Sequence, residues 1–322
     1  MTTRDADDLI LGESPVIREL RSMIRKIARR PEPVLIQGPT GSGKELVAQA
    51  LHQHSGRAGK LVAFNVCAIP ETMFEDSLFG HVRGAFTGAA TDAQGYLLEA
   101  NGGTAFFDEV SGLSLQMQVK LLRAIETGQF RPVGARADRS SDFRVVSAVN
   151  EPLDQLMGEG RFRTDLAHRL STFVLDVPPL CERPADIPVL ARSFAARAAA
   201  IHLPYVELTV CAVRALEQYD WPGNVRELRN VVLATVALSE SPVIDGAMIV
   251  ATFQRKRIGS DVEDKTSFQR RQLLDLLTEH AWDTMEVARE LGVDRATVYR
   301  RMNALSIPTL ARNSTRTARS SA

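Results

Sequence analysis

The chain has 322 residues, 44% of them hydrophobic, which is enough for the cores of two or three domains. Lys and Arg total 39 and Asp and Glu total 39, so net charge indicates no polyanionic partner and any nucleic-acid surface must be local. Three dispersed cysteines, Cys67, Cys181 and Cys211, fit free thiols in a reducing compartment and argue against a metal site. The polar, acidic start and the lack of an apolar run of about 18 residues predict a cytoplasmic protein without a signal peptide or membrane span.

Short β-rich runs alternate with helical segments through the first part of the chain. These runs are residues 33–38, 61–66, 103–109, 143–149 and 173–177. In the helical segment 114–128, Leu115, Val119 and Leu122 fall on one helical face, which indicates an amphipathic helix. The alternation predicts an α/β domain with a mostly parallel sheet over residues 1–180.

The character of the sequence changes after residue 180. Residues 181–250 are rich in Ala, Leu and Arg and lack strand-like runs, which predicts a small helical subdomain broken at WPGN, residues 221–224. Residues 251–266 are charged and poor in apolar residues, as a linker is. A compact helical segment follows at 267–310, and the small, polar and basic tail, 311–322, is expected to be disordered.

A glycine-rich loop, GPTGSGK, follows the first β-rich run and opens a helical segment at 44–54. That placement is what the Gly-x4-Gly-Lys phosphate loop requires, because its N–H groups and the helix N-terminus hold phosphates and its lysine adds positive charge. The residues expected to bind ATP here are Gly38, Pro39, Thr40, Gly41, Ser42, Gly43, Lys44 and Glu45. The alternative is a glycine-rich turn with a surface lysine.

Two acidic residues, Asp108 and Glu109, end the buried apolar strand TAFFDE. Paired carboxylates there are costly unless they hold a cation or a water. The residue after Lys44 is Glu45, where the usual motif has a Ser or Thr for magnesium, so the metal must rely on other groups. We therefore expect Asp108 to hold Mg2+, usually through water, and Glu109 to polarise the attacking water. A plain acidic turn is the alternative.

The hexapeptide GAFTGA, residues 84–89, places one large aromatic side chain, Phe86, among small residues that could not seal a core. Gly84 and Gly88 give the segment conformational freedom. An exposed Phe on a mobile tip can bury its apolar surface only in a partner, a contact worth ~2 kcal/mol. The alternative is a hairpin that tucks Phe86 against its own chain.

These motifs occur in order with GRFRTDLAHRL, residues 160–170, and WPGNVREL, residues 221–228. Together they resemble the AAA+ domain of bacterial enhancer-binding proteins, the activators of sigma-54 RNA polymerase. The resemblance runs from about residue 9 to 245, and the C-terminal segment extends it to about 307. The architecture resembles members without an N-terminal receiver domain, such as the phage-shock activator and the type III secretion regulators of plant pathogens.

The resemblance implies an ATP-hydrolysing activator that binds enhancer DNA and remodels the closed promoter complex. The residues that would contact the sigma factor are Gly84, Ala85, Phe86, Thr87, Gly88 and Ala89, with Phe86 and Thr87 foremost. Val82 stands where the family often carries an acidic residue. No sensory domain precedes residue 9, which predicts control in trans by another protein or by expression level.

Further site residues follow by matching motif positions. Asn65 resembles the family's switch asparagine, which can hydrogen-bond to Glu109; an ordinary strand-end Asn is the alternative. Asn150 resembles the sensor I residue, although Val149 replaces the Thr that commonly precedes it. Arg226 resembles the sensor II arginine, which reaches from the helical lid to the phosphates; a salt bridge at a helix N-terminus is the alternative.

Two arginines six residues apart, Arg163 and Arg169, resemble the finger arginines that are offered to the γ-phosphate of a neighbouring subunit. Such a guanidinium stabilises the transferred charge, whereas lone arginines are more often solvated. Arginines acting in trans imply a closed ring, hexameric by resemblance and possibly shared with a paralogue.

The segment 284–307 has the pattern of a helix-turn-helix, with Gly292 at the turn. The residues expected in its core are Val287, Leu291, Val298 and Leu305, and those expected to contact DNA are Arg295, Thr297, Tyr299, Arg300 and Arg301. Residues 265–322 hold ten Lys and Arg against six Asp and Glu, an excess that supports phosphate contacts. The segment resembles the Fis-like end of the same family, with 267–280 as a dimerising helix; a hairpin used only for dimerisation is the alternative.

Two other functions fit parts of this pattern. A replication initiator or helicase loader also joins an AAA+ domain to a helix-turn-helix, but such proteins lack the GAFTGA insertion. A non-catalytic repressor could use the ATP site only as a binding switch, but the intact Lys44, Asp108, Glu109 and Arg163 argue against it.

Overall fold

The computed structural model describes residues 9–202, 206–239, 241–260, 273, 276, 277, 280, 283–291 and 295–304. The chain divides into two units, Met1–Val250 and Ala251–Ala322. The predicted tail, 311–322, lies outside the described residues. Among the residues described, no helix is both long enough and apolar enough to cross a membrane.

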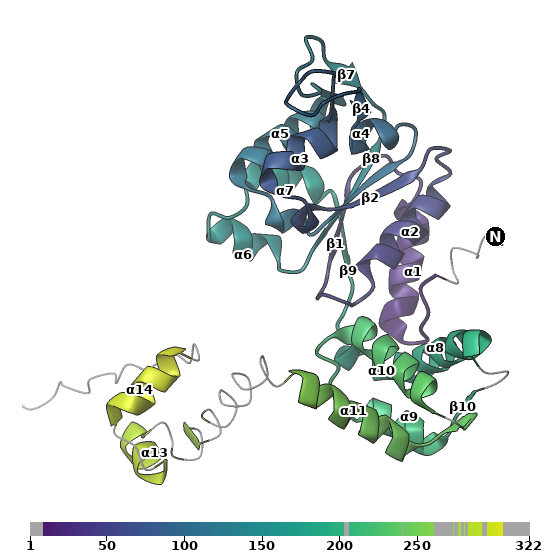
Figure 1. Cartoon of the computed structure of the whole chain (residues 1–322), viewed down its shortest axis with the longest axis vertical. Coiled ribbons are helices and arrows are strands. Elements are labelled where there is room, and N and C mark those ends of the chain that lie inside the picture. Colours follow the sequence, from purple (N-terminus) through teal and green to yellow (C-terminus); the bar gives the residue numbers. More distant parts are fainter. Residues whose placement is uncertain are drawn as a thin grey trace, which may run out of the picture. The chain divides into compact units, whose positions relative to one another are not determined.

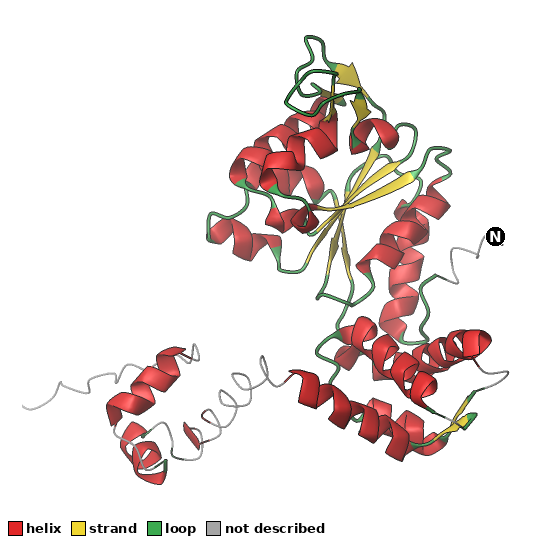
Figure 2. Cartoon of the chain, viewed as in Figure 1, coloured by secondary structure: helices red, strands yellow, loops and turns green. Residues whose placement is uncertain are grey.

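The first unit is built on a five-stranded parallel sheet (Figure 2). Its strands are β1 (Val34–Gln37), β2 (Leu61–Asn65), β5 (Thr104–Asp108), β8 (Arg144–Val149) and β9 (Phe173–Asp176). Their spatial order is β2-β5-β8-β1-β9. β8 is buried along its whole length, which is why its sequence is almost continuously apolar. The predicted α/β fold with a parallel sheet is confirmed.

Helices cover both faces of this sheet (Figure 1). One face carries α1 (Pro15–Ile27) and α2 (Lys44–Ser55), and the other carries α3 (Glu71–Phe79), α4 (Tyr96–Glu99), α5 (Leu115–Thr127), α6 (Leu153–Gly158) and α7 (Thr164–Leu170). Because side chains alternate along a strand, Val34 and Ile36 pack into the core under α1 and α2, while Leu35 packs into the core on the opposite face of the sheet. α1 begins where the Ser14 hydroxyl accepts the N–H of Ile17.

α5 buries a different face from the apolar one noted in its sequence. Leu115 and Val119 are 48% and 46% exposed, and only Leu122 packs partly against the core. The buried residues are Met117, Gln118, Leu121, Ala124 and Ile125. Gln118 can turn inward because its amide donates to two backbone carbonyls and its oxygen accepts the N–H of Arg163.

A helical subdomain follows the sheet. Its helices are α8 (Ile187–His202), α9 (Val210–Glu217), α10 (Asn224–Leu238) and α11 (Gly246–Ser260), with a short parallel pair, β10 (Glu207–Leu208) and β11 (Val243–Ile244). α11 continues through residues 251–260 of the stretch interpreted as a linker, and 261–266 lie outside the described residues. At the WPGN break, buried Trp221 donates its indole N–H to the carbonyl of Leu216.

Two small antiparallel hairpins hold the surface loops of the first unit. One pairs β3 (Gly80–His81) with β4 (Ala93–Gln94), and the other pairs β6 (Gln129–Phe130) with β7 (Arg139–Ser140). The loops bond to each other, because the N–H of Val82 donates to the carbonyl of Val133 (3.1 Å) and the N–H of Val133 donates to the carbonyl of Gly80 (2.8 Å). The GAFTGA hexapeptide lies within the first of these loops.

The second unit contains α13 (Thr284–Glu290) and α14 (Arg295–Ala304). Its buried cluster consists of Leu273, Leu277, Val287, Ala288, Val298 and Met302. Of the four predicted core residues, Val287 and Val298 are fully buried and Leu291 packs partly against the cluster. The fourth, Leu305, and the turn residue Gly292 lie outside the described residues.

A buried cation on β8, Arg144, joins the sheet to the end of α1. Its side chain is 2% exposed, and its guanidinium donates to the carbonyls of Ile27 (2.9 Å) and Ala28. Carbonyls at a helix C-terminus lack intrahelical donors, so these bonds complete the helix. Burial lowers the pKa of Arg144 to about 10, which leaves it protonated at neutral pH.

Arg144→Met keeps much of the side-chain volume but removes both donors from the end of α1. We expect the free energy of unfolding to fall by about 2–3 kcal/mol, measured from the urea midpoint by circular dichroism. The control is Arg136→Met, at an exposed position, with an expected change within about 0.5 kcal/mol. Equal midpoints for the two variants would contradict this role of Arg144.

Candidate functional site

The carboxyl ends of four strands bring predicted site residues to one edge of the sheet. β1 leads into the loop from Gly38 to Lys44, β2 ends at Asn65, β5 ends at Asp108, and Asn150 follows β8. Asn65 and Asp108 are direct partners in the strand register. Ligands of open parallel sheets bind at this edge, so these residues form one candidate site.

The phosphate loop has a backbone that favours glycine. The φ angles of Gly38, Gly41 and Gly43 are 158°, 77° and 112°. At two of these positions space also excludes a side chain, since a Cβ on Gly38 would lie 2.4 Å from the carbonyl oxygen of Val177 and one on Gly41 would lie 2.5 Å from that of Gly223. The loop is therefore closely packed against Val177 and Gly223.

Lys44, the first residue of α2, is buried at 7% exposure. Its ammonium donates to the carbonyls of Gly38 (2.8 Å) and Pro39 (3.3 Å) and to the side-chain oxygen of Asn150. The neighbouring Glu45 is exposed. The lysine thus links the end of β1 to the end of β8, as its predicted place in the site requires.

Glu109 has a left-handed backbone, with φ 58° and ψ 43°, which non-glycine residues rarely adopt. Two amides hold its carboxylate: Asn65 Nδ2 donates to Oε2 at 3.4 Å, and Asn150 Nδ2 donates to Oε1 at 3.2 Å. Because the Asn150 oxygen accepts from Lys44, this asparagine bridges the lysine and the glutamate. The carboxylate is oriented by residues that follow two other strands.

Burial and hydrogen bonds shift the pKa values of the adjacent acids in opposite directions. Burial raises the pKa of Asp108, partly opposed by attraction to Lys44. Burial also acts to raise the pKa of Glu109, but hydrogen bonds led by that from Asn150 outweigh it and the pKa falls below its usual value. Burial lowers the pKa of Lys44, and the two acids oppose this effect. The two adjacent acids therefore differ, because Glu109 gives up its proton more readily than a free carboxyl and Asp108 less readily.

The helical subdomain meets the phosphate loop at the WPGNVREL segment. The main-chain N–H of Arg226 donates to the carbonyl of Gly41 at 3.2 Å, and its exposed side chain is close enough for its charge to lower the pKa of Lys44. Asn224 and Arg183 also contact the loop. Sequence reasoning missed both residues, because WPGN indicated only a break between helices and Arg183 is a single arginine without a motif.

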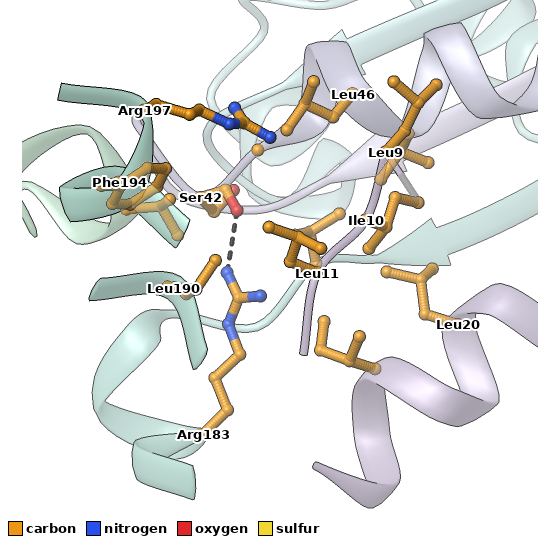
Figure 3. Close-up of a pocket in the computed structure, with 15 residues that line it drawn as sticks. Leu9, Ile10, Leu11, Leu20, Ser42, Leu46, Arg183, Leu190, Phe194 and Arg197 are labelled. Atoms are coloured by element: carbon orange, nitrogen blue, oxygen red, sulfur yellow. Dashed lines mark hydrogen bonds between the residues drawn. The ribbon is translucent and has the colours of Figure 1, made fainter. Parts of the chain in front are cut away.

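An apolar pocket lies beside the phosphate loop (Figure 3). Its lining includes Leu9, Ile10 and Leu11, Leu20 of α1, Ser42 of the phosphate loop, Leu46 of α2, Arg183, and Leu190, Phe194 and Arg197 of α8. Within the part of the chain described, the buried Ser42 hydroxyl has no hydrogen-bond partner. The sequence did not predict this pocket, since its lining segments are far apart along the chain.

The two predicted finger arginines lie on or beside α7. Arg163 precedes the helix and forms an ion pair with Asp165 at 2.6 Å, and Arg169 is exposed in the last turn. Among the residues described here, the hydrogen bonds to the Glu109 carboxylate come from Asn65 and Asn150, and neither arginine donates one.

The hexapeptide turn requires two left-handed glycines. Gly84 and Gly88 have φ angles of 80° and 107°, and a Cβ on either would meet no atom within 4 Å. Conformation rather than packing therefore favours glycine there. The turn closes where the N–H of Gly84 donates to the carbonyl of buried Ala89 (2.9 Å), and Thr87 is exposed.

Phe86 is neither tucked in nor free, since it is 45% exposed and rests edge-to-face on His81 with ring centroids 5.0 Å apart. The Nδ1 atom of His81 is hydrogen-bonded to Asp76 on α3. On the neighbouring loop, a Cβ at Gly134 would lie 2.7 Å from the Cβ of Ala85. His81 and the neighbouring loop at Gly134 thus support the turn, while part of the Phe86 ring faces solvent.

In the second unit, every residue predicted to contact DNA belongs to α14: Arg295, Thr297, Tyr299, Arg300 and Arg301. Exposed Arg295 donates to the hydroxyls of Thr284 and Tyr299, both at 3.1 Å, and its guanidinium lies 5.4 Å from the centroid of the Tyr299 ring. Arg300 donates to the hydroxyl of Thr297 at 2.9 Å. α14 therefore presents polar and cationic groups outside its buried cluster.

The strand order, the phosphate loop at its edge and the acidic pair beside it define an AAA+ ATPase. Comparison with family models gives three matches: the Sigma-54 interaction domain at residues 10–176, the AAA+ ATPase lid domain at 181–266, and the Bacterial regulatory protein, Fis family, at 266–305. The helical subdomain is accordingly called the lid below.

Individual proteins agree with these matches. The chain is 38% identical to the Escherichia coli K12 transcriptional regulatory protein GlrR, covering 91% of this chain and 67% of GlrR. It is 39% identical to the Pseudomonas aeruginosa response regulator PilR, covering 94% and 70%. The crystal structure of Brucella abortus NtrX with ADP has 31% identity and a TM-score of 0.69, covering 92% and 68%. The chain belongs to the bacterial sigma-54-dependent transcriptional regulators, with an AAA+ ATPase domain and a DNA-binding helix-turn-helix.

The oriented carboxylate of Glu109 generates a prediction for hydrolysis. Glu109→Gln is expected to lower kcat at least about 100-fold, because an amide cannot accept the proton of the attacking water. ATP affinity should stay within about threefold, since Lys44 and its loop are unchanged. Phosphate release and equilibrium nucleotide binding measure the two effects.

The control is Glu99→Gln, at an exposed carboxylate paired with Lys60, which should hydrolyse ATP at the wild-type rate. Hydrolysis by Glu109→Gln at more than about a tenth of the wild-type rate would exclude Glu109 as the essential base.

Proposed function

We propose that the chain hydrolyses ATP at the edge of its sheet and uses the energy to remodel sigma-54 RNA polymerase through the GAFTGA loop. The observation that carries the proposal is the single network joining Lys44, Asn150, Glu109 and Asn65. In this network a buried ammonium, whose charge suits a phosphate, lies beside an oriented carboxylate. In the NtrX structures, the relative is in complex with ADP or with ATP.

In the proposed reaction, the N–H groups of the phosphate loop and the Lys44 ammonium hold the β- and γ-phosphates. Glu109 accepts a proton from water as the water oxygen bonds to the γ-phosphorus. The bond from that phosphorus to the bridging oxygen breaks, and ADP leaves with the electron pair. Asn65 and Asn150 keep the carboxylate in position for this step.

Asp108 fits a Mg2+ ion by its donor chemistry. Its half-buried carboxylate is a hard oxygen ligand, and burial raises its pKa, so a nearby cation would stabilise the ionised form. Mg2+ usually takes one or two carboxylates together with phosphate oxygens and water, so a single protein carboxylate beside bound phosphates would suit it. Bound there, the ion would neutralise phosphate charge.

The pocket beside the loop is proposed to receive the base of the nucleotide. Its lining is mainly Leu, Ile and Phe, and the buried Ser42 hydroxyl supplies a polar group. Ser42 and Gly43 belong both to the pocket and to the phosphate loop, so a base in the pocket would be continuous with phosphates in the loop.

Arg163 and Arg169 are proposed to complete the site of a neighbouring chain in a hexameric ring. Support comes from the exposure of Arg163 just before α7 and of Arg169 in its last turn, together with the resemblance to the family's finger arginines. A guanidinium that stabilises the transferred charge is worth about 10³–10⁵ in rate. Head-to-tail contacts of this kind close into a ring, and whether a paralogue enters that ring is decided by its interfaces.

Mixing two inactive variants tests this division. Glu109→Gln lacks the base but offers intact arginines, whereas Arg169→Ala keeps the base but lacks one arginine. In an equal mixture, about a quarter of the interfaces of a randomly assembled ring would be complete, which should restore about a quarter of wild-type ATPase. Phosphate release is measured for each variant alone and for the mixture.

Repeating the mixture with Arg163→Ala in place of Arg169→Ala identifies which arginine acts in trans. If neither mixture is more active than its separate components, the site is complete within one chain and the trans arrangement is wrong.

The exposed parts of Phe86 and Thr87 are proposed to contact sigma-54, and α14 is proposed to enter the major groove of enhancer DNA. The half-exposed ring of Phe86 offers apolar area that only a partner can cover. On α14, Arg295 and Arg300 are exposed and suit phosphate and base-edge contacts. Together these surfaces would hold the ring near a promoter while its loops act on the polymerase.

Thr87→Ala should separate hydrolysis from activation, because Thr87 is exposed in the loop and is not one of the residues proposed to bind or hydrolyse ATP. ATPase should stay within about twofold of wild type, while sigma-54-dependent transcription should fall at least about tenfold. Both are measured with purified chain, with transcription reconstituted using sigma-54 RNA polymerase.

The matched control is Thr91→Ala, an exposed threonine just beyond the hexapeptide, which should keep both activities. Full activation by Thr87→Ala would remove the basis for a sigma-54 contact at the loop tip.

A further inference from the structure

Three consecutive carbonyl groups of the phosphate loop accept hydrogen bonds from the lid. The pairs, donor first, are Asn224 Nδ2 to Thr40 at 3.1 Å, the main-chain N–H of Arg226 to Gly41 at 3.2 Å, and Arg183 Nη2 to Ser42 at 2.8 Å. The loop and these donors lie more than 140 residues apart in sequence, with separations of 184 and 141 for the two side-chain bonds. The lid therefore holds the loop from its outer side.

These bonds bear on the direction of the N–H groups. In a trans peptide the C=O and the next N–H point to opposite sides of the planar unit. Holding the carbonyls of residues 40–42 toward the lid therefore turns the N–H groups of residues 41–43 away from it. The N–H of Ser42 donates to the carbonyl of Pro39 within the loop, at 3.2 Å. The concave arrangement that binds phosphate thus depends on where the lid holds the carbonyls.

Asn224 is the most constrained of the three donors. It is 3% exposed and has a positive φ of 52°. Both ends of its amide are used, because Oδ1 accepts the N–H of Leu180 at 2.8 Å while Nδ2 donates to Thr40. Leu180 lies at the entry to the lid, separated from the last strand of the sheet, β9, by residues 177–179. One side chain therefore joins the first helical turn of α10, the entry to the lid and the phosphate loop.

The second side chain that donates to the loop is Arg183, which bonds to the carbonyl of Ser42. Arg183 is 3% exposed, and its Nε atom has no hydrogen-bond partner among the residues described. Its buried charge lies under the loop, facing Asp186, whose carboxylate accepts the N–H groups of Glu13 (2.6 Å) and Ser14 (2.7 Å). The start of the lid thus holds the N-terminal segment as well as the loop.

We propose that Asn224 is a positioning residue that shapes the phosphate loop from the lid side. The hydrogen bond from its amide to Thr40 fixes the orientation of the loop peptides, so nucleotide affinity depends on attachment of the lid. The inference rests on the proposed role of residues 38–44 in phosphate binding. It adds a side chain that touches the loop on the face opposite to the N–H groups.

Asn224→Gly tests the proposal, because glycine accepts the positive φ and removes the side-chain hydrogen bonds to Leu180, Thr40 and Pro222. In the nucleotide-free full chain, hydrogen exchange of amides in residues 38–43 should be at least about tenfold faster than in wild type. The dissociation constant for ATP should rise about tenfold, while kcat at saturating ATP should fall less than about twofold. The variant should lose ATP affinity rather than kcat, because bound phosphates themselves order the loop.

The matched control is Thr209→Ala, which removes the N-cap of α9, where the hydroxyl accepts the N–H of Ala212 at 3.2 Å. It lowers lid stability without touching the phosphate loop, so loop exchange and ATP affinity should stay at wild-type values. Unchanged loop exchange in Asn224→Gly, or an increase matched by Thr209→Ala, would overturn the proposal.

Asn224→Asp provides a nearly isosteric second variant should glycine prevent folding. The carboxylate can still accept the N–H of Leu180 but cannot donate to Thr40, so loop exchange should again be faster. Lys44→Ala separates the two levels of inference. Normal ATP binding by Lys44→Ala would refute the phosphate-loop assignment, whereas loss of binding there with wild-type behaviour of Asn224→Gly would refute only the role of Asn224.

Discussion

Burial of the Lys44 ammonium is the constraint on which the rest of the site depends. A buried cation is costly unless it is paired and hydrogen-bonded. The carbonyls of Gly38 and Pro39 and the side chain of Asn150 bind it, while the charge of Asp108 partly offsets its burial. These partners follow β1, β8 and β5, so solvating one cation brings three strand ends together. Anionic phosphates can enter such a site because its positive charge is already in place.

The sequence predicted the sheet and the grouping of residues at the carboxyl ends of its strands for definite physical reasons. Buried parallel strands leave near-continuous apolar runs, and the phosphate loop and the acidic pair directly follow two of them. Asn65 and Asn150 were assigned by resemblance, and the structure adds the bonds that join them to Glu109. The proximity of these residues could be anticipated because the carboxyl ends of parallel strands meet at one edge of the sheet.

The contacts between the lid and the phosphate loop, and the apolar pocket beside that loop, could not be anticipated in the same way. Asn224 reaches Thr40 across 184 residues, and no local periodicity records such a contact. The apolar pocket was missed for the same reason, because its lining comes from segments that are far apart along the chain. On α5, Gln118 is buried and Leu115 and Val119 are exposed, contrary to the apolar pattern of the helix. Gln118 can be buried because its hydrogen-bond partners come from the segment just before α7 and from the turn before α5. Tertiary hydrogen bonds overrode the helical pattern there.

The chain also connects the ATP site to the GAFTGA loop by a short route. Asn65, which binds Glu109, is followed at once by a single helical turn, η2 (Val66–Ala68), and then by α3. α3 ends at β3, where His81 bonds back to Asp76 on α3 and supports the ring of Phe86.

A helix packed through Phe74 and Leu78 moves as a unit because its buried side chains cannot slide independently. Asn65 at the Glu109 carboxylate and His81 beside Phe86 are therefore joined by one short, packed segment of the chain. Packed cores of this kind switch between discrete packings rather than deforming continuously.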